Sequence, residues 1–172
     1  MKKLIVIPVL LAAIGIGLSN CGYKLTGFGN QVPEHIKTIA IPDFDNKTAR
    51  YQLDQYITFA VKEEFIKRSD LVLADREARA DAVLEGTINK FDVTPISYGD
   101  DASANLYKVT IAVDVRFIDL KTNEIIFEGK GISFTDTYEI DDEDFFSRET
   151  ETLLKIAEEF AASIVTTILE NF

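Results

Sequence analysis

Apolar side chains occupy every second position between Tyr107 and Phe117, and this is the clearest periodic pattern in the chain. The apolar set is Tyr107, Val109, Ile111, Val113, Val115 and Phe117, and the intervening set is Lys108, Thr110, Ala112, Asp114 and Arg116. Because successive side chains of a strand point to opposite faces, the pattern predicts a strand over residues 107–118 with one buried face. Residues 119–124 then form a short turn, and residues 125–138 are predicted to return as the antiparallel partner.

Two segments carry apolar residues at helical spacing, and each predicts an amphipathic helix that packs one side on a sheet. The first helix is predicted over residues 50–68 and the second over residues 146–170. Their apolar stripes are Leu53, Ile57, Val61 and Phe65 in the first and Leu153, Ala157, Phe160, Ala161, Ile164 and Ile168 in the second. Asn46 and Thr48, in a polar turn at residues 43–48, are candidate caps for the first helix.

Two further strands are predicted where β-branched and aliphatic residues gather, at residues 36–41 and at residues 82–88 with an extension towards Phe91. Residues 71–73 are a candidate edge strand, and residues 94–105 are expected to be a mobile hairpin loop. A right-handed crossover makes the first two core strands parallel. The predicted fold is therefore α+β. It is a two-layer sandwich with a mixed four-stranded sheet and two helices on one face, which leaves the polar face of the hairpin uncovered.

The N-terminal segment has the pattern of an export signal. Lys2 and Lys3 precede an almost entirely apolar run at residues 4–18. As a helix this run would be about 22 Å long, short of the roughly 30 Å hydrocarbon core of a bilayer. Cys21, the only cysteine in the chain, follows directly. The stretch ending at Cys21 resembles a lipobox, although Asn20 stands where Gly, Ala or Ser is usual.

We therefore predict a signal peptide at residues 1–20, a lipidated tether at residues 21–34 and a single domain at residues 35–172. Lipid on Cys21 would hold the protein to a membrane, because each buried CH₂ group contributes about 0.8 kcal/mol. The residue after the cysteine is a glycine and not an aspartate, which would be an inner-membrane retention signal. By resemblance to other lipoproteins, the predicted location is the outer membrane.

Charge and residue chemistry exclude several functions. The net charge is −11, and loss of Lys2 and Lys3 with the signal takes it to −13, so the domain is a poor candidate for nucleic-acid binding. His35 is the only histidine and is interpreted as a surface or hinge residue, because no cysteine or second histidine can complete the usual ligand set of a zinc site with it. The sequence shows no Gly-x-Ser-x-Gly elbow, phosphate loop or dinucleotide motif. We expect no catalytic site, no metal site and no cofactor, and a hydrolase of unknown type is the weakest alternative.

Two acidic clusters are interpreted as surface features that bind no metal ion. Residues 141–144 are all acidic, but they lack the ligand spacing of an EF-hand loop and stand where a helix N-terminus favours negative charge. A metal site there is the less favoured alternative. Asp100 and Asp101 are interpreted as a solvated loop tip.

A family resemblance runs through most of the chain in serial order. It is carried by Cys21-Gly22-Tyr23-Lys24-Leu25-Thr26-Gly27, by residues 32–48 with Ile41-Pro42-Asp43-Phe44-Asp45-Asn46-Lys47-Thr48, by Glu64-Phe65-Ile66-Lys67-Arg68 and by residues 80–88. Together with the predicted hairpin and last helix, these stretches resemble the LptE-like lipopolysaccharide-assembly lipoproteins over residues 21–170. The resemblance implies a domain seated inside a large outer-membrane β-barrel, the LptD-like translocon. There the domain would act as plug and assembly factor and help to pass lipopolysaccharide to the outer leaflet.

The resemblance assigns no lipopolysaccharide-binding residue to a particular position. Lys108, Arg116 and Lys130 are candidate contacts for lipopolysaccharide phosphates by strand position alone, and the alternative is that they are solvent-facing strand residues. The Ile-Pro-x-Phe-x-Asn-x-Thr pattern also resembles a strand in other periplasmic lipoproteins. The alternative function is therefore an accessory lipoprotein of another envelope complex, either a cell-wall synthase activator or a secretion component.

Overall fold

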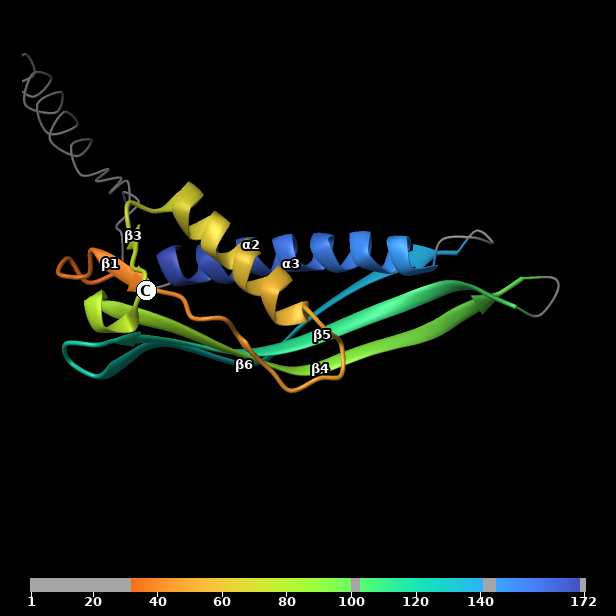
Figure 1. The fold of residues 1–172 in the computed structure, drawn as a ribbon, viewed down its shortest axis with the longest axis horizontal. Helices are drawn as coiled ribbons and strands as arrows, with labels where there is room; N and C mark the ends of the chain where they lie inside the picture. Colours follow the sequence, from red (N-terminus) through yellow and green to blue (C-terminus); the bar gives the residue numbers. More distant parts are fainter. Residues whose placement is uncertain (1–31, 100–102, 141–144, 171–172) are drawn as a thin grey trace, which may run out of the picture.

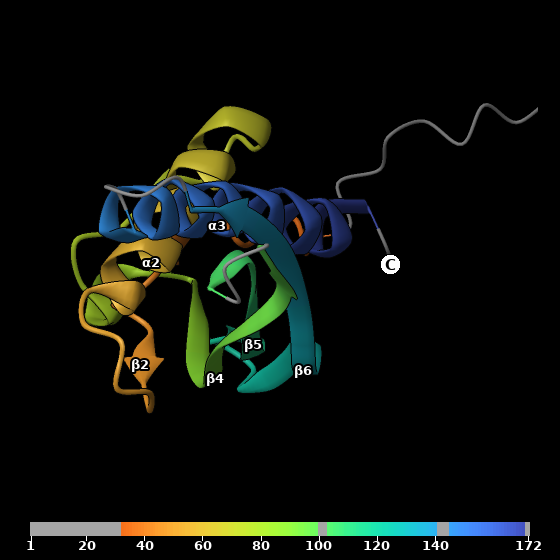
Figure 2. The same cartoon turned by 90° about the vertical axis from the view of Figure 1, so that its right-hand side faces the viewer.

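The computed structural model describes residues 32–99, 103–140 and 145–170. The predicted signal peptide, Cys21 and the acidic residues at 100–101 and 141–144 lie outside the described residues. Within the described chain, a mixed sheet carries two helices on one face (Figures 1 and 2). The predicted α+β sandwich is confirmed.

The sheet has six strands, two more than predicted. They are β1 (Thr38–Ala40), β2 (Asp45–Asn46), β3 (Val72–Leu73), β4 (Ala82–Tyr98), β5 (Ala104–Asp119) and β6 (Glu124–Glu139). The order is β3-β1-β4-β5-β6, and β2 pairs with β4 further along the same edge as β1. β1 is parallel to β4, as the crossover argument predicted, while β4, β5 and β6 are antiparallel. The additional strands are β2 and the candidate edge strand, β3.

The two helices are α2 (Leu53–Arg68) and α3 (Phe145–Glu170), and a 3₁₀ turn spans Glu77–Arg79. They run side by side in the same direction (Figure 1). Near their starts, Arg50 Nε lies 2.8 Å from Glu149 Oε1. Near their ends, Arg68 Nη1 donates a 2.9 Å hydrogen bond to Thr166 Oγ1. These two contacts fix the helix layer at both ends.

The predicted caps of the first helix were wrong. The N-cap is Gln52, whose φ is 63° and whose side chain makes no capping hydrogen bond. Asn46 Oδ1 instead accepts hydrogen bonds from the N–H and hydroxyl of Thr48, and Asn46 Nδ2 donates to the carbonyl of Arg50 at 2.8 Å. These side chains order the turn that leads to α2, because residues 49–52 separate them from the helix itself.

The predicted loop at residues 94–105 was also wrong for most of its length. β4 continues to Tyr98, and its residues pair with β5 as far as Ala104. Pro95 suggested a loop because proline lacks an N–H. In the structure it lies opposite Tyr107, beyond the stretch of β4 that pairs with β1 and β2. Proline is tolerated on such a free edge, where no hydrogen-bond donor is needed.

The core lies between the helices and the apolar side of β5, as the alternation predicted. Val109, Val113, Val115 and Phe117 are fully buried, and the helical stripes of α2 and α3 cover them. Phe160 of α3 packs edge-on against Phe44 and Phe134, with ring centroids 6.4 and 5.6 Å apart. This side of the sheet is therefore closed to solvent.

Carboxylates join the N-terminal segment to the sheet at one end of the molecule. Asp81 Oδ2 accepts hydrogen bonds from the N–H of Lys37 and from the N–H and hydroxyl of Thr38, at 2.8 to 2.9 Å. These bonds lower the pKa of Asp81, the Lys37 N–H contributing most. His35 Nε2 lies 2.7 Å from Asp119 Oδ2, so this exposed histidine has a defined structural contact. Together these contacts form what we call the end clamp.

Asp119 is almost fully buried at the turn between β5 and β6. Burial is the largest single influence and opposes its ionisation. The hydrogen bonds from the N–H groups of Lys121 and Thr122, with that of His35, together outweigh burial and lower the pKa of Asp119. The turn therefore depends on a charged carboxylate.

Acid is expected to destabilise the fold through this clamp. The pKa values of Asp81 and Asp119 are lower in the folded than in the unfolded chain, where 3.8 is the ordinary value. Their stabilisation is therefore present above about pH 4 and is lost as pH falls through the folded pKa values. Thermal melts between about pH 3 and pH 6 should show a falling Tm towards acid, with a shallower slope for Asp119→Asn. Asp70→Asn, outside the clamp, is the control, and equal slopes for both variants would contradict the assignment.

Candidate functional site

The side of β4, β5 and β6 that points away from the helices is not covered by any described element, and we call it the open face (Figure 2). Cross-strand pairing arranges its residues in rows. The rows are Glu85–Arg116–Glu128, Thr87–Asp114, Lys90–Ala112–Ser133, Asp92–Thr110–Thr135 and Thr94–Lys108–Thr137. The open face thus consists mainly of hydroxyl groups and of charges of both signs. This confirms the uncovered polar face that the alternation in β5 predicted.

Asp114 lies at the centre of the open face, where both neighbouring strands are irregular. β4 has an extra residue at Asn89, and β6 has one between Gly129 and Ile132. Gly131 takes a φ of 61° there, and its N–H donates a 2.6 Å hydrogen bond to Asp114 Oδ1. This bond, followed by one from the Asn89 side chain, lowers the pKa of Asp114. Because β-bulges increase local twist, Asp114 stabilises a bend across the middle of the sheet.

The three cations predicted to contact lipopolysaccharide all lie on strands of this face, but they do not form one cluster. Arg116 Nη2 is 2.6 Å from Glu85 Oε2, and Lys130 Nζ is 3.1 Å from Glu128 Oε1. Lys108 is about 26 Å from Arg116 along β5 and has no ion-pair partner among the described residues. Two of the three charges are therefore balanced by acids on the same face, which the sequence pattern did not reveal.

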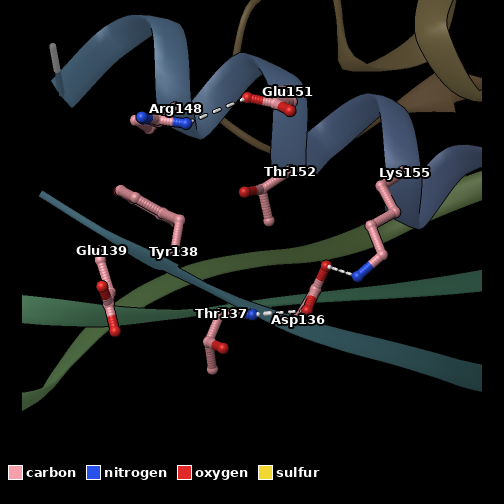
Figure 3. A pocket seen from close by; sticks show the side chains of 8 residues that line it. All are labelled: Asp136, Thr137, Tyr138, Glu139, Arg148, Glu151, Thr152 and Lys155. Carbon is pink, nitrogen blue, oxygen red and sulfur yellow. Dashed lines mark hydrogen bonds and ion pairs between the residues drawn. The ribbon is translucent and has the colours of Figure 1, made fainter.

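A second surface feature is an open cleft of about 350 Å³ between the end of β6 and the start of α3 (Figure 3). Four of its five charged side chains form ion pairs. Lys155 Nζ lies 2.7 Å from Asp136 Oδ2, and Arg148 Nη1 lies 3.6 Å from Glu151 Oε2. Burial, followed by the negative charge of Glu149, raises the pKa of Tyr138 to about 12. The Tyr138 hydroxyl therefore stays protonated at neutral pH.

The described residues contain no group of three or more histidine, cysteine, aspartate or glutamate side chains that would hold a metal ion. His35 contacts a buried aspartate of the end clamp and has no nucleophile beside it in the described hydrogen-bond network. No helix in the described ranges is long and apolar enough to span a membrane. The open face, which runs along three strands, is the candidate binding surface.

A protein-family model and several solved structures match most of the chain. A family model described as LptE, lipopolysaccharide-assembly, matches residues 36–168. Lipoprotein B from Nitrosomonas europaea has a similar solution structure, with a TM-score of 0.58 and 14% identity, covering 86% of this chain and 90% of that chain. A lipoprotein from Caulobacter crescentus gives a TM-score of 0.53 at 16% identity, covering 74% and 88% respectively.

A protein from Chlamydia trachomatis is similar to a comparable degree. Its TM-score is 0.52 at 12% identity, and the alignment covers 79% of this chain and 99% of that chain. No curated protein sequence matches the chain. At such low identity these three likenesses establish a shared fold.

Proposed function

The chain belongs to the lipopolysaccharide-assembly family LptE, and from this premise we propose that it is an outer-membrane lipoprotein that assembles with and plugs a large β-barrel translocon of the LptD kind. In that position it assists insertion of lipopolysaccharide into the outer leaflet. Lipid on Cys21 anchors it. The proposal gives the protein a binding and assembly role without an enzymatic step.

The open face is the observation that carries the plug proposal. A broad three-stranded surface rich in threonine hydroxyls and balanced charges suits a polar, water-lined surface, such as the inside of an outer-membrane barrel. Two of its cations, Arg116 and Lys130, already lie beside Glu85 and Glu128 of the same surface. Docking therefore does not require desolvation of a large unbalanced charge, which would oppose association.

Lipopolysaccharide contact remains a proposal for Lys108, Arg116 and Lys130. Phosphate groups need cations that are not already neutralised. Lys108 is the one of the three without an ion-pair partner in the described part of the chain, so we place the first contact there. Its neighbours across the strands are Thr94 and Thr137. The Thr137 hydroxyl can donate a further hydrogen bond to phosphate oxygen, whereas the Thr94 hydroxyl already donates to Asp92 Oδ2 at 2.8 Å.

Co-purification tests the partnership. A tagged full-length chain is produced in its own cells, and the outer membranes are solubilised in mild detergent. We expect one large β-barrel to be recovered with the tagged protein in near-equal amount, as identified by mass spectrometry. Recovery of a cell-wall synthase or of a secretion complex, with no barrel, would instead support the alternative accessory role.

The anchor has a separate test. Cys21→Ser removes the only sulfur to which a diacylglyceryl group could attach, so the variant should lack acyl chains by mass spectrometry and should leave the outer-membrane fraction. Asn20→Ala is the matched control, because it restores a usual lipobox residue and should be lipidated at least as well. A Cys21→Ser protein that still carried acyl chains would show that the anchor lies elsewhere.

A further inference from the structure

An apolar groove of about 920 Å³ lies between α2 and α3 on the exposed side of the helix layer. Its floor includes Ala157 and Ala161 of α3, and its walls include Phe59, Ile66 and Leu154. These wall side chains are 66%, 58% and 45% exposed. Large apolar side chains that gather around a groove and face solvent mark an interaction site. Docking through the open face leaves the groove uncovered, because the open face lies on the opposite side of the sheet from the helices.

The walls of the groove are two helices, and this limits the kind of polypeptide that can bind there. The backbone N–H and C=O groups inside a helix bond to one another, so an extended segment would find no free strand edge to pair with. A helix satisfies its own backbone groups, and its side chains fit between those of two neighbouring helices. Phe59 and Ile66 are two turns apart along α2, a distance of about 10 Å. The apolar wall therefore matches two turns of a partner helix.

The charges at the rim of the groove determine which sign of charge the partner should carry. Lys67 and Arg68, at one end, both pair with Glu64. Glu63 of α2 and Glu158 of α3 line opposite sides of the groove and are exposed. Neither acid has an ion-pair partner among the described residues. A helix with Lys or Arg on both flanks of its apolar stripe would place a cation beside each of them.

Two other occupants are opposed by charge. A second copy of the chain would bring together two molecules that each carry a net charge of −11, and it would set the acids of one rim against those of the other. An anionic lipid surface would be repelled by Glu63 and Glu158 in the same way. The rim therefore favours a cationic polypeptide.

We propose that the groove between α2 and α3 binds a cationic amphipathic helix of a partner protein. The apolar side of that helix packs between Phe59 and Leu154 and extends to Ile66, while its flanking cations pair with Glu63 and Glu158. This contact does not depend on the proposed docking of the open face in a barrel. It gives the protein a second binding surface, so that one domain can hold two components of an assembly at once.

Site-specific photo-crosslinking tests the proposal in the cells that make the protein. The photoreactive analogue p-benzoylphenylalanine replaces Phe59 in the tagged, full-length chain, and crosslinked peptides are sequenced by mass spectrometry. Tyr51, which is 76% exposed and lies outside the groove, is the control site for the same replacement. From position 59 we expect a crosslink to a segment of another protein that has apolar residues at helical spacing, flanked by Lys or Arg. Position 51 should give no crosslink to that segment.

Charge reversal at the rim tests whether the two acids select the partner. Glu63→Lys with Glu158→Lys should lower the yield of the crosslink at least about tenfold, because like charges then face each other. Glu77→Lys with Glu124→Lys changes the net charge by the same amount outside the groove and should leave the yield unchanged. All four positions are exposed, so both double variants should keep the Tm of the unmodified protein. Equal crosslink yields from the two double variants would overturn the proposal.

The identity of the crosslinked species gives further outcomes that would overturn the proposal. A crosslink from position 59 to a second copy of the chain, to a lipid or to an acidic segment would each do so. Recovery of the barrel by co-purification is measured on the same cells. A barrel without the crosslink would contradict the groove proposal alone, and the crosslink without a barrel would contradict the proposed plug function alone.

Discussion

Phe44→Ala is expected to lower the free energy of unfolding by about 3–5 kcal/mol, as for other buried phenylalanines. Phe44 is 3% exposed, packs edge-on against Phe160 and donates its N–H to Thr58 Oγ1 at 2.9 Å. Its ring also lies over Gly86, where an added Cβ would come within 2.2 Å of a ring carbon. Phe44 thus joins the sheet to both helices, to α3 through its ring and to α2 through its backbone N–H. The loss is large for a domain whose total stability is typically about 5–15 kcal/mol, and urea unfolding followed by circular dichroism measures it.

A double-mutant cycle identifies the contact that is responsible. Gly86→Val alone should also destabilise the domain, because the valine methyl groups need the space that the Phe44 ring occupies. In the double variant the alanine at position 44 vacates that space, so the combined loss should be smaller than the sum of the two single losses. Tyr51→Ala, at a side chain that is 76% exposed, is the aromatic control, with an expected change within about 0.5 kcal/mol. Strict additivity would mean that Phe44 and Gly86 do not compete for space.

Ala112→Arg on the open face is expected to abolish recovery of the β-barrel in the co-purification. Ala112 lies in the middle row, between Lys90 of β4 and Ser133 of β6. A long cation there would hold a closely packed partner away from the face and would bury an unpaired charge, at a cost of several kcal/mol. The yield of barrel per tagged protein, measured by quantitative mass spectrometry, should fall at least about tenfold, which corresponds to about 1.4 kcal/mol.

The control for this prediction is Ser163→Arg, which adds the same side chain at an exposed position on α3. Both variants should keep the Tm of the unmodified protein, because neither side chain is buried in the core. If Ser163→Arg lost the barrel while Ala112→Arg retained it, the helix layer and not the sheet would be the docking surface.

Sequence patterning predicted the elements whose structure depends on local periodicity. The alternation from Tyr107 to Phe117 identified the buried side of β5, and the stripe from Leu53 to Phe65 identified the core side of α2, both as observed. The last helix was predicted within one residue of its start at Phe145. Such patterns are informative because every member of the set faces the same neighbour.

Features that depend on contacts far apart in the chain could not be predicted. The bond between His35 and Asp119 spans 84 positions, and β2 exists because Asp45 and Asn46 meet Thr87 and Ile88 of β4. Asn46 and Thr48 have the chemistry of helix caps but are used in a turn before the helix. The neutralisation of Arg116 by Glu85 follows from strand register, which composition does not specify.

The outer edge of β6 bears on whether the protein associates with other copies of itself. No described strand pairs with this edge, which is 16 residues long, and an unpaired edge of that length is a template for aggregation. The bulge at Gly131, held by Asp114, breaks the regular spacing of its hydrogen-bonding groups. Charged side chains at Glu124, Glu128, Lys130 and Glu139 add repulsion and hydration along its length. The same bend that shapes the open face therefore opposes edge-to-edge pairing of β6 with strands of other copies of the protein.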